Sequence, residues 1–357
     1  MAAAFGKIVQ PLLLSLDPEK AHSLSLVLLK LGLFPKLSRK ADKKLSIDIA
    51  GLKFPNPLGM AAGYDKNADV FDSLLALGFG HVEIGTITPF PQRGNTKPRV
   101  FRFPHEKGII NRLGFNNKGH HHVIQVLARR IHKTGIVGVN IGANKNSEDF
   151  IADYVSGIQR FEDLANYLTI NISSPNTPGL RNLQDKNRLI NLLNHVDKVR
   201  KKTCINGNKR TPIFLKIAPD LSEQDLDNIT SAVLKSDIDA LIVSNTTLSR
   251  DGLFDSKRAP AGGLSGAPLF DRSTRILAHV YQRLEGRIPL IGVGGVVNTV
   301  NAISKIEAGA SLVQIYTGLI YKGPYLVSKM LDEISQHLKK NNLNNLSELI
   351  GKKANMW

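Results

Sequence analysis

The stretch YLTINISS, residues 167–174, decides the fold of this chain. It begins as a run of apolar residues typical of a buried strand, and it ends in asparagine and serine. Seven more short runs of this kind occur along the chain, and each is followed by a stretch with helical periodicity. Eight strand–helix units in succession predict a closed parallel (β/α)₈ barrel. An open doubly wound sheet is the structural alternative.

The predicted strands share an apolar body and an end rich in Gly, Ser, Thr or Asn. They are residues 57–63, 81–86, 136–142, 167–174, 212–219, 240–247, 289–295 and 311–318. The predicted helices are residues 67–77, 118–133, 150–164, 188–201, 222–235, 272–284, 300–308 and 325–338. The alternating segment SIDIAGLKFPNP (46–57) predicts a hairpin that closes the bottom of the barrel.

Residues 1–44 predict a separate helical hairpin. Apolar residues at positions 5, 8, 9, 12, 13 and 16 share one helical face, and Pro11 either kinks this helix or marks its start. Asp17-Pro18-Glu19 then combines an N-cap, a proline at the first helical position and an acid in the first turn. The second helix is expected to end near Phe34. The predicted organisation is a hairpin (1–44), a barrel (45–340) and a C-terminal tail (341–357), with a short helix at 346–350.

The hairpin is apolar and basic, with eight Lys/Arg against three acids. This composition suits the plane of an anionic membrane, although docking on the barrel or on another subunit would also bury the apolar faces. The net charge of the whole chain is +17, but its basic residues are dispersed and few aromatics lie between them, which disfavours nucleic acid. No apolar run approaches the ~20 residues that span a bilayer.

Cysteine and histidine usage argues against a disulfide framework or a metal centre. Cys204 is the only cysteine, so no disulfide can form within the chain, and a reducing, cytoplasmic setting fits best. The run His120-His121-His122 lies at a predicted helix start and is expected on the surface, because no histidine pair and carboxylate have metal-ligand spacing.

Polar residues gather where the predicted strands end. In a (β/α)₈ barrel these ends meet on one face, so the following residues are expected together: Asn140, Asn171, Lys216, Ser244 and Asn245. An unpaired buried amide costs about 1–3 kcal/mol, so the cluster predicts a polar ligand. The glycine-rich segments GVGG (292–295) and YTG (316–318) follow strands 7 and 8, the usual phosphate site of this fold, and GGLSG (262–266) adds further exposed amides.

Two lysines, Lys66 and Lys216, are expected to face this phosphorylated ligand. A lyase would use such a lysine for a Schiff base. A flavoenzyme would place it beside the N1–C2=O edge of the flavin. Spacing alone does not separate these chemistries.

A series of motifs carries a resemblance to a known family. In chain order they are AAGYDKN, EIGTITP, GNTKPRVFR, INRLGFNN, NIGANK, NISSPNTPGLR, LKIAPDLS, SNTT, GGLSG, IGVGG and SLVQIYTG. Together they resemble the dihydroorotate dehydrogenases over nearly the whole chain. The resemblance is closest to the membrane-associated, quinone-using class, because a hairpin precedes the barrel and Ser174 stands where the soluble class carries cysteine.

The resemblance implies FMN in the barrel and oxidation of dihydroorotate to orotate in pyrimidine synthesis. The implied flavin contacts are Ala62, Gly63, Thr86, Asn140, Asn171, Lys216, Ser244, Gly266, Gly295, Tyr316 and Thr317. The implied substrate contacts are Lys66, Asn111, Arg112, Leu113, Gly114, Phe115, Asn171, Asn176, Asn245 and Thr246. Ser174 would remove the C5 proton while hydride leaves C6 for flavin N5, with a proton relay through water and Thr177, and residues 174–185 would form a lid.

The same resemblance implies a quinone tunnel between the two N-terminal helices, with His22, Arg102 and Tyr316 as its polar contacts. It also implies a peripheral protein on the cytoplasmic face of the cell membrane. Three alternatives stay open: a soluble enzyme that reduces fumarate or NAD, a Schiff-base lyase using Lys216, and a non-catalytic protein that binds a phosphorylated ligand and docks on membranes.

Overall fold

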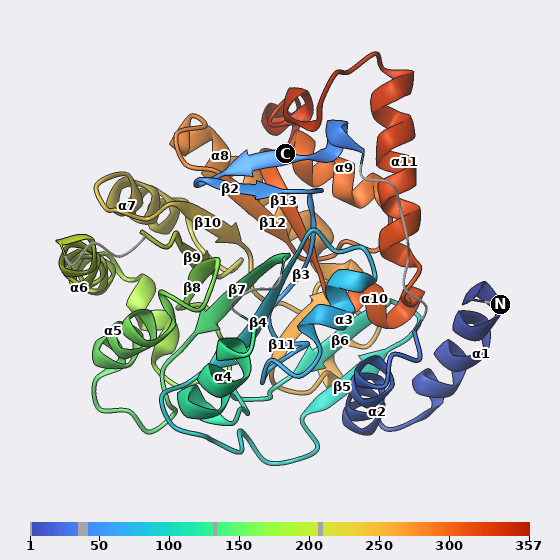
Figure 1. Cartoon of the computed structure of the whole chain (residues 1–357), viewed down its shortest axis with the longest axis horizontal. Helices are drawn as coiled ribbons and strands as arrows, with labels where there is room; N and C mark the ends of the chain where they lie inside the picture. Colours follow the sequence, from blue (N-terminus) through green and yellow to red (C-terminus); the bar gives the residue numbers. More distant parts are fainter. Residues whose placement is uncertain (1, 35–41, 131–133, 206–209) are drawn as a thin grey trace.

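A closed barrel of eight parallel strands forms the body of the protein (Figure 1). The computed structural model describes residues 2–34, 42–130, 134–205 and 210–357. The barrel strands are β3 (Leu58–Met60), β4 (His81–Ile87), β7 (Ile136–Ile141), β8 (Tyr167–Asn171), β9 (Ile213–Ile217), β10 (Ala240–Val243), β12 (Leu290–Val293) and β13 (Ala310–Ile315). Strand β13 pairs with β3 and closes the ring. The predicted (β/α)₈ barrel is confirmed, and the open sheet is excluded.

Helices cover the outside of the barrel, as predicted. They are α3 (Phe71–Ala76), α4 (Gly119–Ala128), α5 (Phe150–Phe161), α6 (Lys186–Ile205), α7 (Glu223–Leu234), α8 (Phe270–Leu284), α9 (Thr299–Glu307) and α11 (Leu326–Lys340). Helix α3 begins later than predicted, because the Asp65 carboxylate accepts hydrogen bonds from the amides of Asp69 and Val70 and holds the preceding residues in turns. The short helix α10 (Thr317–Lys322), directly after β13, was not predicted.

A two-stranded hairpin closes the bottom of the barrel, which confirms that prediction. Strands β1 (Ile47–Ile49) and β2 (Leu52–Phe54) pair in antiparallel fashion. Phe54 is fully buried in a hydrophobic cluster with Ile136 and Ala240, the first residues of β7 and β10. The hairpin therefore seals the ends of the strands opposite to the predicted site.

A three-stranded antiparallel sheet, β5 (Val100–Phe103), β6 (Gly108–Asn111) and β11 (Gly263–Gly266), was not predicted. Strands β5 and β6 belong to the connection after β4, whereas β11 belongs to the connection after β10. The register pairs Leu264 with Ile110, and both are fully buried. This sheet forms only when the barrel brings the two connections together, so local sequence patterns do not reveal it.

The N-terminal residues form the predicted pair of helices, α1 (Ala2–Ser15) and α2 (Pro18–Lys30). Asp17 is the predicted N-cap, and its carboxylate accepts hydrogen bonds from the amides of Glu19 and Lys20. Pro11 lies inside α1. Helix α2 ends at Lys30, four residues before the predicted end at Phe34. No helix in the described part of the chain is both long and apolar enough to cross a membrane.

The helical pair lies against the barrel beside α10 and β5 (Figure 1), and polar side-chain contacts hold it there. The Arg99 guanidinium donates hydrogen bonds of 2.6 and 3.1 Å to the two carboxylate oxygens of Glu19. The Ser25 and Tyr64 hydroxyls lie 2.9 Å apart. Arg102 donates to the carbonyls of Leu14 and Leu16 at the end of α1. Part of the hairpin is therefore docked on the barrel.

The other side of the helical pair keeps apolar side chains in solvent. Leu12, Leu16, Leu24, Val27, Leu31 and Leu33 are between 36% and 66% exposed. The C-terminal residues, in contrast, pack on the barrel helices: the predicted helix at 346–350 is a 3₁₀ turn, Leu346–Leu349, and Trp357 meets the edge of the Phe270 ring.

We expect Glu19→Gln to loosen the docking of α2 by about 2 kcal/mol, because the buried Arg99 loses a charged acceptor. The hydrogen bond from Arg99 lowers the pKa of Glu19, and the charges of Arg99 and Lys97 add to this effect, whereas burial opposes it. The stabilisation is therefore present above the unfolded pKa of about 4.3 and is lost as the pH falls through the lower folded value.

Amide hydrogen exchange of residues 18–30, measured as a function of pH, reports how often α2 detaches from the barrel. Wild-type exchange should accelerate below about pH 4, and Glu19→Gln should show fast exchange at neutral pH. Glu285→Gln changes an exposed carboxylate and serves as the control. Equal protection of α2 in all three proteins would contradict the role of the Arg99–Glu19 pair.

Candidate active site

A cavity of about 400 Å³ opens at the ends of the barrel strands and continues to the N-terminal helices. Its wall includes residues that follow β3, β8, β10, β12 and β13, together with residues of α1 and α2. His22 on α2 meets the edge of Tyr64, with ring centroids 5.2 Å apart, and Tyr64 meets the edge of Tyr316 at 5.7 Å. These three rings form a continuous aromatic wall from the hairpin to the end of β13.

A buried carboxylate lies at the centre of the polar network beneath the cavity. Glu83 on β4 is fully buried and accepts hydrogen bonds from Asn140 Nδ2 (2.7 Å), Gln314 Nε2 (2.9 Å) and the Tyr167 hydroxyl (3.2 Å). The side-chain oxygen of Asn140 in turn accepts a 3.2 Å hydrogen bond from Asn171 Nδ2. Glu83 therefore fixes the orientation of both asparagine amides. Because the Asn140 NH₂ group donates to Glu83, the Asn140 oxygen faces Asn171 and accepts from its NH₂ group.

Two lysine side chains, Lys66 and Lys216, line the cavity. Burial lowers the pKa of Lys66 to about 8 and also lowers the pKa of Lys216, where the Glu83 charge acts in the opposite direction. Among the described residues, none accepts a hydrogen bond from either ammonium group. A ligand with acceptor or anionic groups would supply the partners that these donors lack.

Three glycine-containing segments, residues 262–266, 292–295 and 316–318, approach one another at the end of the cavity formed by the loops after β10, β12 and β13. Gly266 and Gly295 have φ values of +93° and +75°, and a Cβ atom at Gly295 would lie 2.3 Å from Phe270 Cα. Only glycine fits at position 295, so its backbone packs directly on the start of α8. Gly266 and Gly295 both line the cavity. Thr317 lies beside them, with its hydroxyl 2.9 Å from that of Ser265. Backbone amides and a hydroxyl in this arrangement are suited to an anion such as a phosphate.

The loop after β8 carries the candidate base. Ser174 is 5% exposed, lines the cavity, and its Oγ accepts a 3.2 Å hydrogen bond from the Asn176 amide. Asn176 Nδ2 donates to the carbonyl of Asn111 at 3.1 Å, which joins this loop to β6. The buried Thr177 hydroxyl has no hydrogen-bond partner among the described residues.

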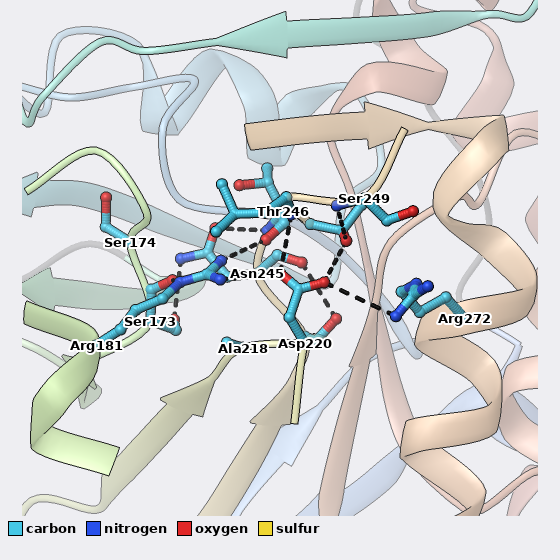
Figure 2. Close-up of polar contacts among 12 residues, drawn as sticks. Ser173, Ser174, Arg181, Ala218, Asp220, Asn245, Thr246, Ser249 and Arg272 are labelled. Atoms are coloured by element: carbon cyan, nitrogen blue, oxygen red, sulfur yellow. Dashed lines mark hydrogen bonds and ion pairs between the residues drawn. The ribbon is translucent and has the colours of Figure 1, made fainter. Parts of the chain in front are cut away.

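Arg181 ties this loop to the loops after β9 and β10, as Figure 2 shows. Arg181 donates hydrogen bonds to the carbonyls of Ser173 (3.0 Å) and Thr246 (2.8 Å) and pairs with Asp220 at 2.9 Å. Asp220 also accepts from the Leu248 amide. The guanidinium therefore joins the loops after β8, β9 and β10, while the Ser174 hydroxyl points away from this cluster (Figure 2).

The cavity wall contains every predicted flavin contact except Asn140, which hydrogen-bonds to Thr86 and Asn171 instead. Every predicted substrate contact except Arg112 also lines it. The Arg112 side chain turns to the carbonyl of Pro98 and stacks over the Phe101 ring. The predicted tunnel residues His22, Arg102 and Tyr316 line the cavity.

The expectation that the run His120-His121-His122 lies on the surface is correct for the exposed His121 but wrong for His120. His120 does not lie on the surface: it is 2% exposed and packs edge-on against Phe161, because the first turn of α4 faces α5. Burial lowers the pKa of His120 to about 4. Across the described residues, no three or more His, Cys, Asp or Glu side chains gather as a metal site. The side chain of Cys204 lies outside the described residues.

Sequence reasoning missed Glu83, Gln314, Arg181 and Asp220. The first two had a visible signal, since each is a polar residue inside an apolar strand run, HVEIGT and SLVQIYTG. Arg181 and Asp220 had none beyond their place in the motifs NISSPNTPGLR and LKIAPDLS, because their partners come from other loops.

Comparisons with known proteins support one family. The family model described as dihydroorotate dehydrogenase matches residues 44–338. The protein named dihydroorotate dehydrogenase (quinone) from Allorhizobium ampelinum is 51% identical over 100% of this chain and 99% of its own length. The protein of that name from Brucella anthropi is 52% identical, over 100% and 98%. A crystal structure of DHODH from Eimeria tenella in complex with ferulenol superposes with a TM-score of 0.89 at 37% identity, covering 94% of this chain and 96% of that one.

We expect Arg181→Lys to free the 173–180 segment, because lysine cannot reproduce the forked contacts to Ser173, Thr246 and Asp220. Amide hydrogen exchange in this segment should rise at least about tenfold, the equivalent of about 1.4 kcal/mol. Arg188→Lys, at an exposed position on α6, is the matched control. Unchanged exchange in Arg181→Lys would show that other contacts hold the loop.

Proposed function

Because the chain belongs to the dihydroorotate dehydrogenase family, we propose that it oxidises (S)-dihydroorotate to orotate in pyrimidine synthesis and passes the electrons to a membrane quinone. The observation that carries this proposal is one continuous cavity. At one end it contains a glycine-rich segment suited to an anion, formed by Gly266, Gly294, Gly295 and Thr317 and called the anion cradle below. It also contains an amide-rich wall, a candidate base and the space between two apolar helices. The curated relatives named as quinone enzymes match the whole chain, including the hairpin.

Members of this family are flavoproteins, and the residues present fit FMN. The phosphate would lie on the backbone of Gly266, Gly295 and Thr317, where no side chain obstructs it. Lys216 is buried and directed at the cavity, and its ammonium would stabilise negative charge on the flavin ring. When bound, FMN supplies the acceptor for the hydride that leaves C6 of dihydroorotate.

Asparagine side chains are suited to binding the substrate ring. Each amide offers both a donor and an acceptor, so Asn111, Asn171, Asn176 and Asn245 can pair with the ring N–H and C=O groups. Lys66 would pair with the substrate carboxylate. The pKa of Lys66 is about 8 without that partner, and an adjacent carboxylate would raise it and keep the ammonium charged.

Ser174 is the candidate base for the C5 proton. Its oxygen accepts only an amide hydrogen bond from Asn176 among the described residues, so a lone pair remains available. The unpaired Thr177 hydroxyl is a candidate for carrying the proton onward through water. Arg181 would anchor the start of the 174–185 lid through the Ser173 carbonyl and tie the lid to the loop after β10 through the Thr246 carbonyl, and the closed lid would exclude water.

The hairpin would deliver the quinone to the flavin. We propose that it rests on the cytoplasmic face of the cell membrane, and its outward leucines and basic flanks support contact with an anionic bilayer surface. His22, Arg102 and Tyr316 would contact the quinone along the cavity. Burial, with a contribution from Lys66, lowers the pKa of His22 well below its usual value, so this imidazole is neutral and offers one donor and one acceptor.

The purified protein should be yellow, and anaerobic dihydroorotate should bleach its flavin absorbance. A soluble quinone analogue should then restore the colour, whereas fumarate and NAD should not. Borohydride with a carbonyl substrate should trap no adduct at Lys216. A colourless protein that cannot be reconstituted with FMN would refute the proposed function.

We expect Ser174→Ala to retain FMN but to lower the rate constant of flavin reduction by dihydroorotate about 100-fold or more, the usual contribution of a general base. Stopped-flow absorbance under anaerobic conditions measures this step directly. Ser174→Cys is the matched variant, because a thiolate is a base at lower pH than a serine alkoxide. It should restore part of the rate and shift the pH profile to lower pH. Unchanged reduction in Ser174→Ala would exclude Ser174 as the base.

A further inference from the structure

Lys305 on α9 is fully buried, and its hydrogen-bond partners among the described residues are neutral. Its Nζ donates hydrogen bonds to Ser273 Oγ (2.8 Å) and Thr274 Oγ1 (3.1 Å) and lies 5.4 Å from the centroid of the Phe270 ring. These contacts supply two hydrogen-bond acceptors and the face of an aromatic ring, but no negative charge. No ion pair within the described residues includes Lys305, and a buried charge without an opposite charge is costly.

The partners of Lys305 lie directly behind the anion cradle. Phe270 and Ser273 belong to the first turn of α8, and the Ser273 hydroxyl shares its hydrogen between the carbonyls of Phe270 (3.0 Å) and Gly294 (3.1 Å). The stem of Lys305 packs on β12, since a Cβ atom at Gly292 would lie 3.0 Å from Lys305 Cδ. Gly294 itself lines the cavity. The Ser273 side chain and the Gly294 backbone therefore lie between the Lys305 ammonium and the cavity.

We propose that Lys305 is the buried counter-charge of the flavin phosphate and a positioning residue for the Gly294–Gly295 turn, an inference that rests on FMN as the cofactor. The ammonium does not touch the phosphate. It acts across a dry, low-dielectric layer, where the attraction between opposite charges is far stronger than in water. The N-terminal end of the α8 dipole points the same way and adds to it. A phosphate dianion in the cradle would offset the cost of burying Lys305.

The protonation of Lys305 offers a readout that does not depend on catalysis. Burial lowers its pKa to about 7, against the raising effect of Asp271, the charged group that acts on it from α8. A phosphate dianion nearby would raise that pKa. At about pH 8 the lysine is mostly neutral without FMN and mostly charged with it, so FMN binding takes up protons. Riboflavin lacks the phosphate and should take up none.

The first test compares FMN with riboflavin in the full-length protein stripped of flavin. Lys305→Met keeps the volume of the stem and removes the charge, and flavin fluorescence quenching gives both dissociation constants. We expect FMN binding to weaken about tenfold for each pKa unit of coupling, with riboflavin binding unchanged. Ser273→Ala retains the ammonium and should keep most of the preference for FMN.

Equal weakening of FMN and riboflavin in Lys305→Met, or no change in either, would overturn the proposal and leave Lys305 as a packing residue between α8 and α9. A wild-type protein that binds neither flavin would instead refute the proposed function, so the two failures are distinguishable.

The second test needs no variant and therefore does not depend on the folding of Lys305→Met. Calorimetry of flavin binding to the wild-type protein at about pH 8, in two buffers with different ionisation enthalpies, counts the protons taken up. Uptake with FMN and none with riboflavin supports the counter-charge. Equal values for the two flavins would overturn it.

Discussion

The carboxylate of Glu83 is the interaction on which the arrangement of the site depends. It is buried inside the barrel and receives donors from β7, β8 and β13 through Asn140, Tyr167 and Gln314. Losing any donor would leave a buried charge under-solvated, so these strands are held in one relative position. The same carboxylate lies near Lys216 on β9 and opposes the effect of burial on its pKa. The polar surface under the proposed flavin is therefore organised from the barrel centre outward.

Two arginines hold the N-terminal helices and the Ser174 loop in place around the site. Arg99 fastens α2 through Glu19, and both of these charges act on the pKa of Lys66 in the proposed substrate site. Docking of the hairpin is thus electrostatically coupled to the group that would bind the substrate carboxylate. Arg181 ties the loop that carries Ser174 to the loop after β10 through the carbonyls of Ser173 and Thr246. In both cases an arginine guanidinium makes several hydrogen bonds that restrain the neighbouring backbone.

The sequence predicted most of the barrel because its periodicity is local. Each strand is a short apolar run with a polar end, and all eight were identified together with the closing hairpin β1–β2. The N-cap at Asp17 was equally visible, since capping involves neighbours only. The β5–β6–β11 sheet and the burial of His120 were not, because they depend on segments that meet only after the barrel forms.

The candidate site divides in the same way. The sequence by itself determined which residue types stand at the strand ends, and the fold rule for barrels then placed Asn171, Ser174, Lys216 and Gly295 on one face. Only the tertiary structure decided that Arg112 turns away, that Arg181 joins three loops, and that Lys305 lies behind the Gly294–Gly295 turn. The physical reason is the separation along the chain between the residues that interact. Strand and cap patterns arise from bonds within a few residues, whereas the partners of a buried charge are chosen by the packing of distant elements.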